Sequence, residues 1–166
     1  MIPRLALVGT LIAACVGQLG AQQAQLDLHG NYALGTTSKL HSWGAGVGLQ
    51  TTFGSSQSVV KLSLSPSVDL LKQEDGGPTQ TTVSADLDIQ PGETHLFTPY
   101  TGVSAGANWS GGSAKQWDGA KLGLEMLLGV ALKLNSAVSL KSEERFGYVK
   151  GEEHTLTTRV GALLTL

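Results

Sequence analysis

The residues best suited to chemistry in this chain are acids and bases that recur at every second position. Glu143 and Arg145 stand two residues apart, and Glu125 and Arg159 lie in the alternating segments on either side. Side chains two apart in a strand point to the same face, so Glu143 and Arg145 should lie next to each other. Paired carboxylates could act as acid and base in catalysis, or these acids and bases could belong to a buried network of ion pairs.

Other chemistry is weakly represented. The histidines His29, His41, His95 and His154 have no HxxxH-type spacing and fall in different segments, which argues against a zinc site. No His-x-Ser pair of the kind expected in a lipid A deacylase is present. The net charge of −2 lacks the basic character that nucleic-acid binding requires. We therefore expect no catalytic residue, no metal, no cofactor and no nucleic-acid partner.

Strands must position these charges. From Lys121 to Leu134 every second residue is apolar, beginning at Leu122, while Glu125 and Lys133 stand on the other parity. This two-residue period predicts a strand of about 13 residues, roughly 44 Å long, about twice the usual length in soluble proteins. A strand tilted by about 40° and of this length crosses a bilayer.

Eight such segments are separated by Gly-, Ser-, Pro- and Asp-rich links. They span residues 26–34, 43–53, 60–70, 83–90, 103–109, 121–134, 138–148 and 155–166. Charged residues make up 14% of the chain against about 25% in typical soluble domains, as suits a protein with little surface in water. The sequence predicts an all-β, eight-stranded antiparallel up-and-down transmembrane barrel over residues 25–166. Pro66 removes a hydrogen-bond donor within the third segment, so we expect a bulge there.

A signal peptide is predicted over residues 1–21, with its end between residues 20 and 24. Met1–Arg4 is a short positive region, Leu5–Val16 is apolar, and small residues follow at Gly20 and Ala21. Cys15, the only cysteine, stands in a segment similar to a lipoprotein lipobox and could carry lipid. Cleavage there would leave only about ten apolar residues, so we favour a cysteine removed with the signal peptide.

Alternation alone leaves open which face of the barrel points inward. A lipocalin-like exported carrier also has eight strands, with apolar side chains inside around a small apolar ligand. The membrane version is favoured by Trp43, Phe53 and Trp109 at the ends of apolar rows, where interfacial aromatic residues belong. Glycines gather on the polar parity, where they would leave room for long side chains inside a narrow barrel.

Residues 99–109, PYTGVSAGANW, and Glu143–Phe146 resemble the PYxGxGxGxxY and ExRY strands of the OmpA/OmpX-like outer-membrane β-barrel family. The resemblance implies a barrel in the cell outer membrane, in contact with its lipid and inserted by the barrel assembly machinery. It also implies a role in envelope integrity, adhesion or binding through surface loops. The terminal Leu166 departs from the usual Phe, and Glu144 falls on the parity that faces lipid.

The polar parity carries equal numbers of acids and bases. The acids are Asp27, Asp69, Asp86, Asp88, Glu125 and Glu143, and the bases are Lys61, Lys121, Lys133, Lys141, Arg145 and Arg159. An eight-stranded barrel just holds its own side chains, so these charges should pair across the lumen and leave no substrate pocket. We expect Glu143 and Arg145 at the centre of a structural network, with Glu125 and Arg159 beside them, in a non-conducting, non-enzymatic monomer whose surface ligand the sequence does not identify.

Overall fold

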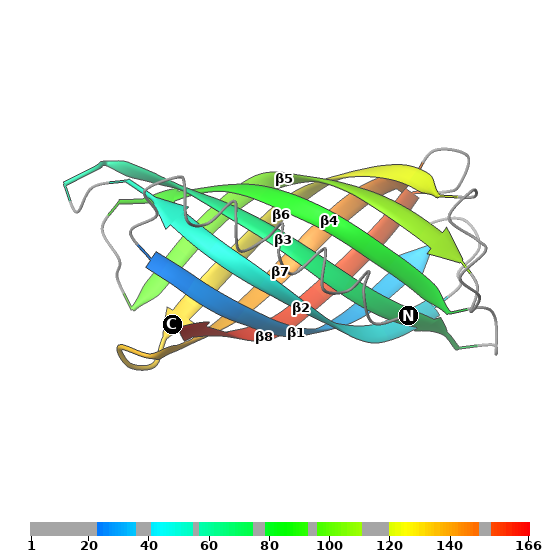
Figure 1. Cartoon of the computed structure of the whole chain (residues 1–166), viewed down its shortest axis with the longest axis horizontal. Helices are drawn as coiled ribbons and strands as arrows, with labels where there is room; N and C mark the ends of the chain where they lie inside the picture. Colours follow the sequence, from blue (N-terminus) through cyan, green and yellow to red (C-terminus); the bar gives the residue numbers. More distant parts are fainter. Residues whose placement is uncertain are drawn as a thin grey trace, which may run out of the picture.

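A computed structural model describes residues 23–35, 41–54, 57–74, 79–92, 96–110, 120–149 and 154–166, and these form one closed antiparallel barrel (Figure 1). The eight strands are β1 (Gln23–Gly35), β2 (His41–Phe53), β3 (Val60–Gln73), β4 (Gln80–Pro91), β5 (Phe97–Ser110), β6 (Lys121–Lys133), β7 (Val138–Val149) and β8 (His154–Thr165). Each strand pairs with the next, and β8 closes the barrel against β1. The predicted fold class is confirmed, while the predicted signal peptide and Cys15 lie outside the described residues.

Every strand has 12 to 14 residues, so several extend beyond their alternating sequence segments. β4 continues to Pro91 and β5 begins at Phe97, which shortens their link to residues 92–96. We call the end where β1 begins and β8 stops the terminal end, and residues 54–59, 92–96 and 134–137 link strands there (Figure 1). Residues 36–40, 74–79, 111–120 and 150–153 link strands at the opposite end.

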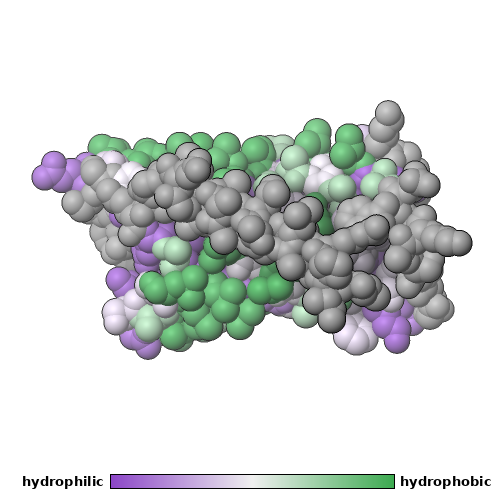
Figure 2. Space-filling view, viewed as in Figure 1, coloured by the Kyte–Doolittle hydropathy of each residue, from purple (hydrophilic) through white to green (hydrophobic). Residues whose placement is uncertain are grey.

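The wall of the barrel is apolar on the outside. Along β6 the outward row includes Leu122, Leu124, Met126 and Leu128, with exposed fractions of 71%, 65%, 69% and 67%. Figure 2 shows apolar residues over much of the visible wall and hydrophilic residues toward its two ends. No described helix has the length and apolar character needed to cross a bilayer.

The interior is polar, which is the reverse of a soluble domain. Among the described residues, only Leu127 and Leu163 are buried hydrophobic side chains, whereas many Asp, Ser, Thr, Glu and Arg side chains are buried. The lipocalin-like alternative is therefore wrong, because it requires the apolar faces to line the lumen.

Glycines on the inner face of β2 make room for these side chains. A Cβ at Gly46 would collide with the Asp69 carboxylate and with the His29 ring. A Cβ at Gly44 would collide with the backbone of β3 at Leu70. The space expected above the β2 glycines is thus occupied by side chains of β1 and β3.

Pro66 causes no bulge. Gly48 pairs with Ser67 and Thr51 with Leu64, so the offset between β2 and β3 is the same on both sides of the proline. Pairing between β2 and β3 is interrupted opposite Pro66 and Ser65, but neither strand contains an extra residue there. The expected bulge is wrong because a missing donor interrupts pairing locally but adds no residue to either strand.

Two other features of the outer face were visible in the sequence. Glu144 faces outward, as its parity predicts. The Thr158 hydroxyl lies 3.0 Å from both carboxylate oxygens of Glu144 and donates a hydrogen bond to this carboxylate. Hydrocarbon would offer the carboxylate no hydrogen bond. Near the opposite end, His154 stacks on Phe146 with 5.5 Å between ring centroids, and the Tyr32 hydroxyl meets Nδ1 of His41. These rings extend the aromatic belt expected from Trp43.

Candidate functional site: the charged lumen

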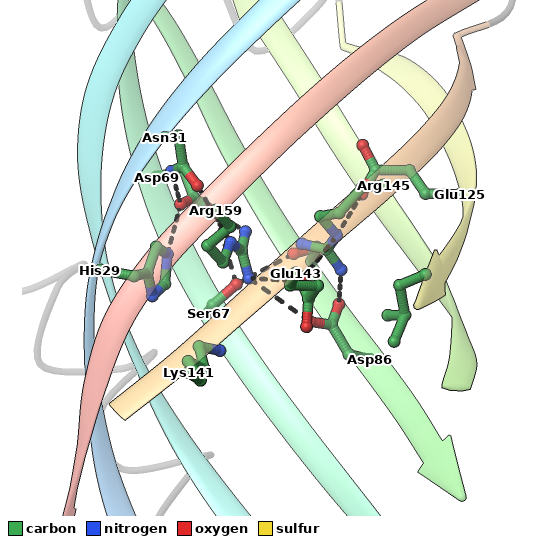
Figure 3. A network of polar contacts seen from close by, with 12 residues as sticks. His29, Asn31, Ser67, Asp69, Asp86, Glu125, Lys141, Glu143, Arg145 and Arg159 are labelled. Carbon is green, nitrogen blue, oxygen red and sulfur yellow. Dashed lines mark hydrogen bonds and ion pairs between the residues drawn. The ribbon is translucent and has the colours of Figure 1, made fainter. Parts of the chain in front are cut away.

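Arg145 occupies the middle of the lumen and is 2% exposed. It projects inward from β7, and its guanidinium reaches three carboxylates contributed by three strands (Figure 3). Nη2 lies 2.6 Å from Oδ1 of Asp86 on β4, while Nε lies 3.0 Å from Oε2 of Glu125 and 3.2 Å from Oε1 of Glu143. The planar fork of Arg suits such a position because its donors are fixed in one plane.

Arg159 forms a second centre from β8. Its Nη2 lies 3.1 Å from Oδ2 of Asp69, and its Nε donates to Oδ1 of Asn31 at 3.0 Å. Its Nη1 lies 3.5 Å from Oδ2 of Asp86, so Asp86 contacts one arginine with each oxygen. Asp86 thereby joins the two centres into one lumen network.

A third cation extends the network toward β1. The Lys141 ammonium lies 2.5 Å from Oδ2 of Asp27. His29 stands between two aspartates, with Nδ1 at 3.1 Å from Asp27 and Nε2 at 2.7 Å from Asp69. Asn31 donates to the same Asp69 oxygen at 2.5 Å. The chain of contacts therefore runs from Asp27 through His29 and Asp69 to Arg159.

The structure brings the four residues singled out from the sequence into one network. Glu125, Glu143 and Arg145 meet directly, and Arg159 Nη1 lies 3.9 Å from Oε1 of Glu143. Glu143, Arg145 and Arg159 are 2–3% exposed. The side chain of Glu125 is 28% exposed and forms the edge of the network.

Sequence reasoning missed three polar participants. His29 was considered only as a metal ligand, Asn31 was not singled out, and Tyr100 was seen only as part of a family motif. Tyr100 donates its hydroxyl to Oε2 of Glu143 at 2.9 Å. All three stand on the polar parity of their strands, so the same alternation that selected the acids could have selected them.

The acids and bases of the polar parity are equal in number, but they are distributed unequally along the lumen. Lys61 and Lys133 stand near the terminal end, and Lys121 stands at the start of β6, at the opposite end. Six carboxylates thus share the middle of the lumen with Lys141, Arg145, Arg159 and His29. Asp88 is 6% exposed, and its Oδ1 has neither a hydrogen bond nor an ion pair within the described part of the chain. The expectation of uniform pairing is wrong for Asp88, because pairing depends on which layer of the barrel each charge occupies.

This arrangement suits mechanical cross-linking of the wall. The network ties side chains of β1, β3, β4, β6, β7 and β8 together, and Tyr100 adds β5. Within the described residues no group of three or more His, Cys, Asp or Glu side chains is placed to hold a metal ion.

The wall is apolar on the outside, and the lumen is filled by charged side chains. These two features define a class of small barrels in which the usual polarity of a soluble protein is reversed. Neisserial surface protein A has a similar crystal structure, with 17% identity, a TM-score of 0.61, and coverage of 86% of this chain and 95% of that one. The outer membrane protein Ail of Yersinia pestis, determined in a phospholipid bilayer nanodisc, is 12% identical with a TM-score of 0.52, covering 86% of this chain and 99% of that one. A de novo designed transmembrane β-barrel is 13% identical with a TM-score of 0.51, over 86% of this chain and 95% of the design.

No protein-family model and no curated protein sequence matches the chain. The structural similarity therefore establishes the fold of outer-membrane barrels.

Proposed function

We propose that this protein is an integral barrel of the outer membrane with a structural or surface-interaction role. The observation that carries the proposal is the inversion of polarity, with leucines on β6 about two-thirds exposed and arginines 2–3% exposed. Water would penalise such an outer wall, whereas the hydrocarbon core of a bilayer stabilises it. By the usual arrangement of these barrels, the terminal end faces the periplasm.

The similar structures support the membrane assignment, since their names describe a surface protein and an outer membrane protein. Membership in the OmpA/OmpX-like family, insertion by the barrel assembly machinery and a monomeric state are part of the proposal. The role that we propose is non-enzymatic, and the charged side chains in the middle of the lumen contact one another. Residues 111–120 form the longest link at the opposite end and offer the largest segment for contacts at the cell surface.

The localisation is tested by fractionating cells that express the full chain. We expect the protein in the outer-membrane fraction, resistant to alkaline washing and released only by detergent. A soluble, detergent-independent pool in the periplasm would contradict the proposal.

For the surface role, residues 111–119 are replaced by a Gly/Ser segment of equal length. Pull-down from intact cells should lose its partner while membrane insertion stays unchanged, and retention of every partner would place the role elsewhere.

We also expect this barrel not to conduct. Eight strands give an interior that just accommodates side chains, and the layer of Arg145, Arg159 and Asp86 is buried across the lumen. Planar-bilayer recordings of the refolded protein should show no stable unitary conductance. A control is the Arg145→Gly variant, which removes one of the two arginine side chains from this layer. Reproducible unitary steps in the unmodified protein would contradict the prediction.

A further inference from the structure

The lumen opens at its terminal end into a polar cavity of about 140 Å³, which we call the terminal vestibule. Its described lining includes Gln50, Lys61, Gln90, Tyr100, Lys133 and Leu163. A dry cavity of about 150 Å³ holds one benzene molecule, so this one has room for a group of similar size. Its amide and hydroxyl groups are suited to a polar occupant.

The charged side chains in the described lining of the terminal vestibule are both positive. Lys61 on β3 and Lys133 on β6 are the only charged side chains in its described lining. Within the described part of the chain neither ammonium has an ion-pair partner, in contrast to Lys141 deeper in the lumen. Two unpaired cations beside a cavity lined by amide donors form a site for an anion.

The terminal vestibule borders the lumen network. Tyr100 lines its inner part and donates its hydroxyl away from the cavity, to Glu143 of the lumen network. Leu163, which is 4% exposed, also belongs to its lining.

The carboxylate of Asp88 lies deeper in the lumen than the terminal vestibule, and its negative charge opposes the binding of an anion. Lys61 pairs with Gln90 across β3 and β4, and Ser63 pairs with Asp88, so Asp88 stands one inward-facing position deeper than Gln90. Diagonal neighbours in a sheet are about 7–8 Å apart. Coulomb energy falls with distance, so an ammonium in contact with an anion outweighs a carboxylate that stands farther from it. Asp88 should weaken the site without abolishing it.

We propose that the terminal vestibule binds an oxyanion, namely a phosphate group of a free solute or of a lipid headgroup. Lys61 and Lys133 supply the charge, and side-chain amides such as those of Gln50 and Gln90 donate hydrogen bonds. The site borders the lumen network at Tyr100, and it does not depend on the surface role proposed above.

The test is a titration of the folded barrel with inorganic phosphate, followed by NMR of the glutamine side-chain amides. The protein is held in a maltoside detergent, because phosphocholine detergents carry the competing group. We expect saturable shifts confined to the terminal vestibule. Lys61→Gln and Lys133→Gln should each weaken binding by about tenfold, as expected for a lost hydrogen bond to a charged group.

Two matched variants make the test specific. Lys72→Gln removes a lysine from β3 outside the terminal vestibule and should leave the affinity unchanged. Asp88→Asn removes the opposing charge and should strengthen binding several-fold. Shifts that do not saturate, or an equal loss in Lys72→Gln and Lys61→Gln, would overturn the proposal.

The source of the phosphate is separated by changing the bilayer. In phosphatidylglycerol nanodiscs, a lipid headgroup that fills the site would produce the bound-state amide shifts before any phosphate is added. A free solute would instead produce them only on titration with phosphate or glycerol 3-phosphate. Absence of the shifts under both conditions contradicts phosphate binding from either source.

Discussion

Replacing Arg145 by alanine should lower the free energy of unfolding by about 3–5 kcal/mol, the usual result of breaking a buried ion pair from one side. The variant leaves Glu125 and Glu143 facing each other without their nearest cation, in a position where Arg145 itself is 2% exposed. Glu143 gains little compensating solvation because it is 2% exposed. Urea unfolding of matched samples in detergent measures the change.

The control for Arg145→Ala is Lys72→Ala, which removes an exposed cation from the outer face of β3 and should cost little. A double variant separates charge from lost packing. Adding Asp86→Asn to Arg145→Ala should cost less than the sum of the two single changes, because Asp86 Oδ1 lies 2.6 Å from Arg145 Nη2. Equal stability of Arg145→Ala and Lys72→Ala would show that the lumen network does not stabilise the barrel.

Replacing Leu128 by arginine should cost about 2–4 kcal/mol of folding free energy in a bilayer, since an arginine on the lipid face near the midplane is penalised by that amount. Leu128 is 67% exposed near the middle of β6 and pairs with Thr101 and Glu144. Reversible folding into lipid vesicles, followed by tryptophan fluorescence, measures the cost. We do not expect the protein to fold in water without lipid or detergent, so the assay requires vesicles.

Leu134→Arg provides the matched control for Leu128→Arg. Leu134 is 54% exposed and follows β6 at the terminal end, where the cost of a lipid-facing arginine falls to about 0–1 kcal/mol. The turn residue Gly54 is unsuitable because its φ of 130° strains any other side chain. Equal costs at Leu128 and Leu134 would contradict a bilayer around this wall.

Much of the fold could be predicted from local sequence. Leu122 to Leu134 alternate with Glu125 and Lys133, and the structure turns these two sets to opposite faces of β6. Strand ends were less predictable, because Pro91 and Phe97 continue β4 and β5 past the alternating segments. The effect of Pro66 was also mispredicted, since a missing donor has two structural outcomes and only the pairing of β2 with β3 distinguishes them.

The sequence by itself determined which side chains share a face, because the two-residue period is a property of each strand alone. It could not determine which charges meet, because Arg145 and Asp86 belong to β7 and β4 and come together only when the barrel closes. The closing of the barrel and the offset between neighbouring strands also set the depth in the lumen at which each charge lies. They bring Asp86 between two arginines, leave Oδ1 of Asp88 without a hydrogen bond within the described part of the chain, and hold Lys61 and Lys133 at the terminal end beside a cavity. Equal numbers of charges in a sequence are therefore paired or unpaired according to the tertiary structure.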